Sequence, residues 1–241
     1  MIREATIWEN NFLMIFVDAV LLYEAAVACE DPDLNSAMAK SSILSVNCAL
    51  EAAANSFLES VEITSKLKDK IDRLSTLEKF DFVLQWHTDH HLASGDSHVQ
   101  AVANLIKNRA KMVHPKVVKR KISFQTQAGP DGIKHTEVKE DPVKGQDTKA
   151  KVLGPDVSIY TDRDAKAALM AMTSFLNIYI HWWGIPFEQA ELFLFQRWDS
   201  SVQARQVMFR VAEINTLIRN NHFLDIRFMG IHGMLKEDGN K

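Results

Sequence analysis

Two long stretches near the start of the chain contain no glycine and no proline, and their apolar residues recur at helical spacing. The first covers residues 5–28 and the second covers residues 34–62. Apolar side chains three and four positions apart share one face of an α-helix, so both stretches are predicted to be helical. The acidic segment around Pro32 separates them, and Asp33 is predicted to cap the second helix. This beginning favours a mainly α fold.

Helical spacing continues along the next part of the chain. A helix is expected from residue 65 to residue 86, followed by a polar connection over residues 88–95 and a further helix capped by Asp96. Pro115 disfavours the α conformation of the residue before it. This last helix is therefore expected to end at His114.

The pattern changes after residue 116. β-branched and aromatic residues at shorter spacing occupy residues 117–126 and 152–160, and a polar stretch with glycine and proline separates them. These features predict a β-hairpin-like excursion. A helix over residues 162–183, ended by glycine and proline, and a second helical stretch over residues 187–220 are expected to follow.

We interpret the chain as one domain in three parts. Residues 1–116 form a helical bundle core, residues 117–161 a β-containing insertion, and residues 162–241 additional helices that pack on the same core. A chain of 241 residues, 46% of them hydrophobic, is long and apolar enough to bury such a core.

The remaining bulk features predict a cytoplasmic protein without a membrane span. Cys29 and Cys48 lie in apolar helical patterns, so we expect two buried thiols and no disulfide. The chain starts without the basic and apolar segments of a secretory signal. Its most apolar runs, within residues 12–23 and 167–185, are interrupted by polar residues and are short for a span.

Positive charge is concentrated around the predicted helix end. Residues 97–130 contain no aspartate or glutamate, although the chain has a net charge of -3. The lysines and arginines of this window are Lys107, Arg109, Lys111, Lys116, Lys119, Arg120 and Lys121. A local positive field of this kind suits phosphate and hence nucleic acid. The alternative is a solvated basic helix end, where cations meet the helix dipole favourably.

Arg109 precedes His114 by five residues. Residues five apart lie about 140° apart around a helix, but a helix end broken by proline can bring the two side chains together. A histidine that exchanges a proton and a guanidinium that stabilises phosphate charge suit RNA cleavage without a metal. Arg227 and His232 have the same spacing without a basic run, and we interpret that pair as coincidence.

Residues 36–116 resemble the HEPN family of helical domains. The similarity rests on an alanine-rich helix with Glu51 and Asn55, on a helix around Leu77-Glu-Lys-Phe80, and on the run from Leu105 to Lys116. That run looks like the family's R-x4-6-H motif, which falls on Arg109 and His114.

The resemblance implies an RNA-associated protein, with metal-independent endoribonuclease activity of toxin or defence type. It implies a homodimer, a partner antitoxin and catalytic Arg109 and His114. The RNA contacts would then be Lys107, Asn108, Lys111, Lys116, Lys119, Arg120 and Lys121. Active members commonly carry a polar residue after the arginine, where this chain has Ala110. The alternative is therefore a catalytically inactive HEPN-like module for RNA binding, protein binding or dimerisation.

A histidine-rich segment offers a second alternative. His87 and His91 are four residues apart and would share a helical face, and Asp89 lies between them. With His98 they could form a metal-binding protein or a hydrolase, whereas the ordinary interpretation is a polar helix end. The glycine-rich phosphate loop and the dinucleotide fingerprint are absent from the sequence, and we expect no cofactor.

Overall fold

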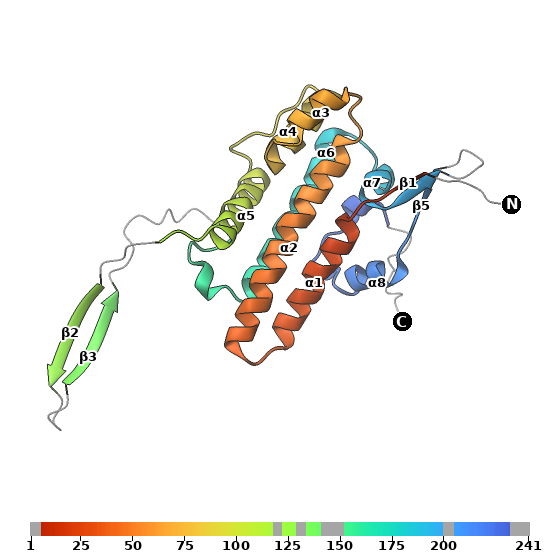
Figure 1. The fold of residues 1–241 in the computed structure, drawn as a ribbon. Helices are drawn as coiled ribbons and strands as arrows, with labels where there is room; N and C mark the ends of the chain where they lie inside the picture. Colours follow the sequence, from red (N-terminus) through yellow and green to blue (C-terminus); the bar gives the residue numbers. More distant parts are fainter. Residues whose placement is uncertain (1–5, 118–121, 129–133, 141–151, 200–204, 232–241) are drawn as a thin grey trace.

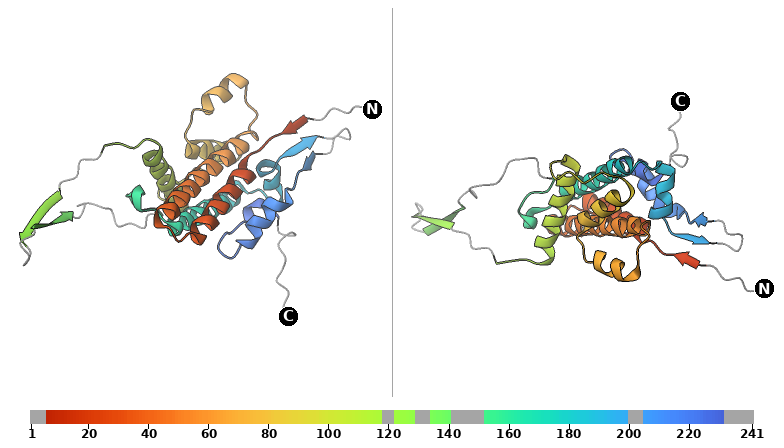
Figure 2. Two further views of the ribbon diagram at one scale, coloured as in Figure 1. Left: turned by 60° about the horizontal axis from the view of Figure 1, so that its bottom comes forward. Right: turned by 90° about the horizontal axis from the view of Figure 1, so that it is seen from above.

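The two long helices predicted at the start of the chain lie side by side. A computed structural model describes residues 6–117, 122–128, 134–140, 152–199 and 205–231, in which α1 spans Phe12–Ala28 and α2 spans Pro32–Leu58. Figures 1 and 2 show α1 on one side of α2 and α5 on the other. The mainly α fold class is confirmed.

The starts of both helices differ from the prediction. Residues Thr6–Trp8 form the strand β1, and α1 begins only at Phe12, whose N–H donates to Asn10 Oδ1 at 2.8 Å. The cap of α2 is Asp31, which accepts from the N–H groups of Asp33 and Leu34. Pro32 then occupies the first helical position, where its missing N–H costs nothing.

The predicted helix over residues 65–86 is two helices, α3 (Ser65–Ile71) and α4 (Thr76–His87). Ser75 and Glu78 form a capping box that starts α4 afresh, and helical periodicity alone does not reveal this break. The next helix, α5 (Ser97–Val113), is capped by Asp96 and ends with His114 as its C-terminal cap, as predicted.

The insertion contains the predicted hairpin, but its second strand lies earlier in the chain than predicted. β2 (Ile122–Ala128) pairs antiparallel with β3 (Lys134–Glu140), and the hairpin projects away from the helices (Figure 1). The predicted strand over residues 152–160 is a loop with a 3-10 turn, η1 (Val157–Ile159). Its apolar residues serve the helical core instead, because Leu153 and Tyr160 are each 1% exposed.

The helix α6 (Asp162–Trp183) forms the centre of the core. The helix ends at Gly184, as predicted from the glycine at this position, and Gly184 has a φ of 75°. Its Tyr179 stacks on Phe57 of α2 with ring centroids 5.5 Å apart, and the Tyr179 hydroxyl donates to the carbonyl of Phe80 at 2.9 Å. Burial raises the pKa of Tyr179 well above its ordinary value. α6 therefore joins α2 and α4 into one core.

The single helix predicted over residues 187–220 is wrong. The chain forms α7 (Phe187–Leu194), β4 (Arg197–Asp199), β5 (Arg205–Val207) and α8 (Val211–Arg219), then the short turn η2 (Arg227–Met229). β4 lies between β1 and β5 in a three-stranded antiparallel sheet. This pairing joins residues from distant parts of the sequence, which local periodicity cannot predict.

The segment after α8 is held to α6 by one buried side chain. Asn177 donates to the carbonyl of Asp225 at 2.7 Å and accepts from the N–H of Phe228 at 2.8 Å. Gly230 completes the turn with a φ of 70° and lies directly against the backbone of Phe187. The C-terminal segment is thus part of the same core.

Two further expectations meet different outcomes. Cys29 is half-buried and Cys48 is exposed, so the prediction of two buried thiols is wrong. Cys48 lies on the outer face of α2, where the alanine-rich sequence made every face look apolar. Among the described helices, none combines the length and the apolar character needed to cross a membrane.

Candidate nucleic-acid interface

Arg109 lies on the face of α5 that packs against the core. It follows Leu105 by four residues and Val102 by seven, and both of those side chains are fully buried. Its Nη1 lies 3.7 Å from Oε2 of Glu51 on α2, and each of the two side chains is 40% exposed. Arg109 therefore ties the end of α5 to α2 while part of its guanidinium stays open to solvent.

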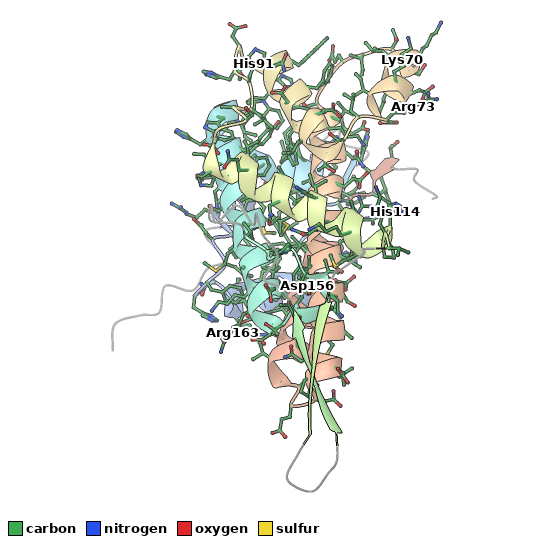
Figure 3. The ribbon with its side chains drawn as sticks, turned by 90° about the vertical axis from the view of Figure 1, so that its left-hand side faces the viewer. Lys70, Arg73, His91, His114, Asp156 and Arg163 are labelled. Carbon is green, nitrogen blue, oxygen red and sulfur yellow. The ribbon has the colours of Figure 1, made fainter. Side chains whose placement is uncertain are left out.

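His114 lies at the opposite side of the helix end. Its N–H donates to the carbonyl of Ala110 at 2.9 Å, and its backbone leaves the helix with φ −124° and ψ 67° before Pro115. The side chain is exposed, and Figure 3 shows it at the end of α5, which lies across α2 and α6. Among the described residues, no hydrogen bond joins His114 to Arg109.

The outer side of α5 carries the remaining positive charges. His114 follows Lys107 by seven residues and Lys111 by three, so these three lie on one side of the helix. Lys107 and His114 are exposed, and so is Lys116 in the segment that follows. We call Lys107, Lys111, His114 and Lys116 the α5 basic face.

Two members of the predicted RNA-binding set have internal contacts. Lys111 donates to Asn108 Oδ1 at 3.1 Å and to the carbonyl of Pro155 at 3.2 Å, and the second bond fastens the loop after the hairpin to α5. Asn108 is only 1% exposed and donates to the carbonyl of Asn104, so it is not on the accessible surface. The other predicted contacts, Lys119, Arg120 and Lys121, lie outside the described residues.

The histidine-rich segment does not assemble a ligand set. His87 Nε2 lies 2.8 Å from Ser60 Oγ, and the centroids of the His87 and Trp183 rings are 5.2 Å apart. Burial lowers the pKa of His87. Asp89 and His91 are exposed. Within the described residues, no group of three or more histidine, cysteine or acidic side chains is placed to hold a metal ion.

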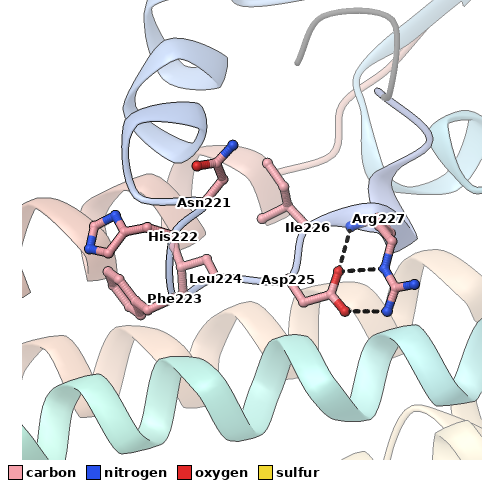
Figure 4. A pocket seen from close by; sticks show the side chains of 7 residues that line it. All are labelled: Asn221, His222, Phe223, Leu224, Asp225, Ile226 and Arg227. Atoms are coloured by element: carbon pink, nitrogen blue, oxygen red, sulfur yellow. Dashed lines mark hydrogen bonds and ion pairs between the residues drawn. The ribbon is translucent and has the colours of Figure 1, made fainter. Parts of the chain in front are cut away.

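In the second arginine–histidine pair, Arg227 and His232, the arginine forms an ion pair with a neighbouring aspartate. Arg227 forms a two-pronged ion pair with Asp225, at 2.8 Å and 2.5 Å, on the rim of a surface hollow of about 320 Å³ (Figure 4). The Asp225 carboxylate raises the pKa of Arg227, and Arg227 in turn lowers that of Asp225. His232 lies outside the described residues. Arg227 is thus neutralised locally.

Sequence reasoning missed two side-chain contacts made by α2. The sequence indicates Glu51 only as part of the alanine-rich helix, yet its carboxylate is the acid that lies beside Arg109. Lys79 of α4 is 3% exposed and donates to Asn55 Oδ1 on α2 at 2.7 Å. A charged residue four positions before the buried Val83 was the signal that could have revealed this inward lysine.

Comparison with known protein families, with curated proteins and with solved structures found no match to this chain.

Proposed function

We propose that this chain is a HEPN-like, RNA-associated protein of the cytoplasm that binds RNA through the α5 basic face. The observation that supports this most is the exposure of Lys107, His114 and Lys116 on the last turns of α5 and in the segment directly after it, where the helix itself contains no acidic residue. Phosphate neutralisation by such side chains supplies most of the affinity of proteins for nucleic acid. The negative end of the α5 dipole stabilises the same cations when no RNA is bound.

RNA cleavage is the second candidate. The His114 side chain is exposed, and the Arg109 side chain is 40% exposed, so an imidazole suited to general acid–base catalysis and a guanidinium suited to phosphate are both accessible. Within one chain these side chains lie on different sides of α5, so a cleaving site needs a second copy that supplies the complementary residue. Homodimerisation with two α5 ends in one cleft meets that need, and a partner antitoxin would act by covering the cleft.

Binding is tested with a labelled single-stranded oligoribonucleotide by fluorescence anisotropy at two salt concentrations. We expect the double variant Lys107→Glu with Lys116→Glu to lose affinity by about tenfold or more and to show a shallower salt dependence. Lys70→Glu with Arg73→Glu is the matched control, because it reverses two exposed charges, one on α3 and one in the turn that follows it (Figure 3). Equal affinities of the two double variants would exclude the α5 basic face.

Cleavage is tested on the same oligoribonucleotide with excess chelator, alongside a measurement of molar mass by light scattering. We expect the wild type to be dimeric and to cut, and His114→Ala and Arg109→Ala to bind without cutting. A wild type that binds but leaves RNA intact supports the non-catalytic module. Cutting by both variants would show that the activity does not use this pair.

A further inference from the structure

Lys79 is a buried cation whose described partner is neutral. Its side chain reaches Asn55 Oδ1 at 2.7 Å, and the residue is 3% exposed. Among the described residues, no carboxylate forms an ion pair with it. Removal of an ammonium group from water is costly, so buried lysines are ordinarily paired with an anion. In this structure that anion is not supplied by the described part of the chain.

A second cation, Arg109 of α5, contacts α2 one helical turn before Asn55. Glu51 and Asn55 are four residues apart and share one side of the helix, with Cβ atoms about 6 Å apart. Arg109 of α5 contacts Glu51, and Lys79 of α4 contacts Asn55. We call these four residues the α2 charge cluster. Two cations and one carboxylate leave it with one positive charge in excess.

The cluster is open to solvent on one side. Asn55 is exposed, and the side chains of Glu51 and Arg109 are each 40% exposed. A ligand can therefore approach from the surface and reach the amide and the guanidinium first. Lys79 lies at the inner end, where its charge acts in a less polar environment and is screened less by salt.

We infer that the α2 charge cluster is a binding site for a phosphate-class anion. Phosphate oxygens accept hydrogen bonds from a lysine ammonium, from an asparagine amide and from the planar fork of an arginine. Such an anion balances the excess charge and gives Lys79 the anionic partner that the described residues do not supply. The site goes beyond the proposed RNA contact, because none of its members belongs to the α5 basic face.

Thermal unfolding with inorganic phosphate, compared with chloride at equal ionic strength, tests the site. We expect a saturable rise in the unfolding midpoint of the wild type, of about 3 °C at tenfold excess over the Kd. Lys79→Met should abolish that rise, whereas Lys70→Met, which removes an exposed lysine on α3, should keep it. No saturable rise in the wild type would overturn the inference.

Asn55→Asp makes the test independent of how well Lys79→Met folds. This substitution keeps the shape of the side chain and places a carboxylate beside Lys79. We expect a higher unfolding midpoint than that of the wild type without phosphate, together with loss of the phosphate-dependent rise. If Asn55→Asp kept the full rise, the anion would bind elsewhere and the inference would be wrong.

The source of the phosphate is decided with the labelled oligoribonucleotide. If Asn55→Asp and Lys79→Met lower RNA affinity by about tenfold, the ligand is a phosphate of the RNA backbone. If they abolish the effect of inorganic phosphate and leave RNA affinity unchanged, the ligand is a free phosphate compound. The Lys107→Glu with Lys116→Glu variant should keep the phosphate-dependent rise, so the two proposals can fail separately.

Discussion

Arg109 Nη1 lies 3.7 Å from Glu51 Oε2, and both side chains remain 40% exposed. A pair exposed to this degree contributes about 1 kcal/mol or less, because water screens the charges. We therefore predict that Arg109→Ala and Glu51→Ala both fold, with a coupling free energy below about 1 kcal/mol in a double-mutant cycle. Urea unfolding of the wild type, the two single variants and the double variant measures this coupling free energy.

This first prediction also separates function from stability. If Arg109→Ala folds normally, a loss of RNA cleavage or of phosphate binding reports on the site itself. A coupling free energy above about 2 kcal/mol would contradict the prediction and would identify the pair as a major stabiliser of the α2–α5 contact.

Gly230 and Gly184 provide a second, matched comparison. Both have positive φ, 70° and 75°, but a Cβ on Gly230 would lie 2.4 Å from the carbonyl oxygen of Phe187, whereas Gly184 has open space around it. We expect Gly184→Ala to lower the free energy of unfolding by about 1 kcal/mol. Gly230→Ala should cost about 3 kcal/mol or more, because a backbone clash adds to the strain.

Urea unfolding at constant pH distinguishes the two glycine variants. Equal losses for Gly184→Ala and Gly230→Ala would mean that the contact between Gly230 and α7 is not close in solution.

The link between α1 and α8 should depend on pH. Arg219 donates to both carboxylate oxygens of Glu24, at 2.7 Å and 2.6 Å, and thereby holds the pKa of Glu24 below its ordinary value. A carboxyl whose pKa is lower in the folded state stabilises the fold above its unfolded pKa, about 4.3. That contribution is lost as the pH falls through the folded pKa.

The measurement is the free energy of unfolding of wild type and Glu24→Gln from pH 7 down to pH 3. The wild type should be more stable at neutral pH, and the difference should be constant until about pH 5 and shrink below about pH 4. Glu62→Gln removes an exposed carboxylate that forms no ion pair with the described residues, and it serves as the control. A difference that grows towards acid would contradict the assignment.

Asn177 should contribute more to stability than an average polar residue. It satisfies the carbonyl of Asp225 and the N–H of Phe228, and it is 9% exposed. Asn177→Ala leaves both groups without a partner, so we expect a loss of about 3 kcal/mol in the free energy of unfolding. Asn221→Ala, at an exposed position in the same segment, should change it by less than about 0.5 kcal/mol.

Amide hydrogen exchange gives the Asn177 prediction a second readout. The N–H of Phe228 should lose its protection in Asn177→Ala and keep it in Asn221→Ala. Protection that persists in both variants would mean that another acceptor replaces the asparagine.

Helix ends with strong local signals were predictable from the sequence. Asp96 caps α5, Pro115 stops it at His114, and Gly184 ends α6, because each of these residues restricts the backbone of its immediate neighbours. The break between α3 and α4 was missed, since a capping box inside an amphipathic stretch does not interrupt its periodicity.

Features that depend on distant residues were not predictable. The strand β1 exists because Trp8 meets Arg197, and no local pattern in either segment specifies that register. The same limit applied to the candidate site. The sequence placed Arg109 and His114 near one helix end, but only the packing of α5 on α2 decides that Arg109 turns inward to Glu51.

The register of β1 has a consequence for the order in which the protein assembles on the ribosome. Thr6 pairs with Asp199, so this strand leaves the ribosome long before its partner β4 has been made. Closing so long a loop is entropically costly, and non-local strand pairing is slow for that reason. The α1–α2 pair can form early from adjacent sequence. The strand β1 can dock only after β4 has been made, so its docking follows the pairing of α1 with α2 during synthesis.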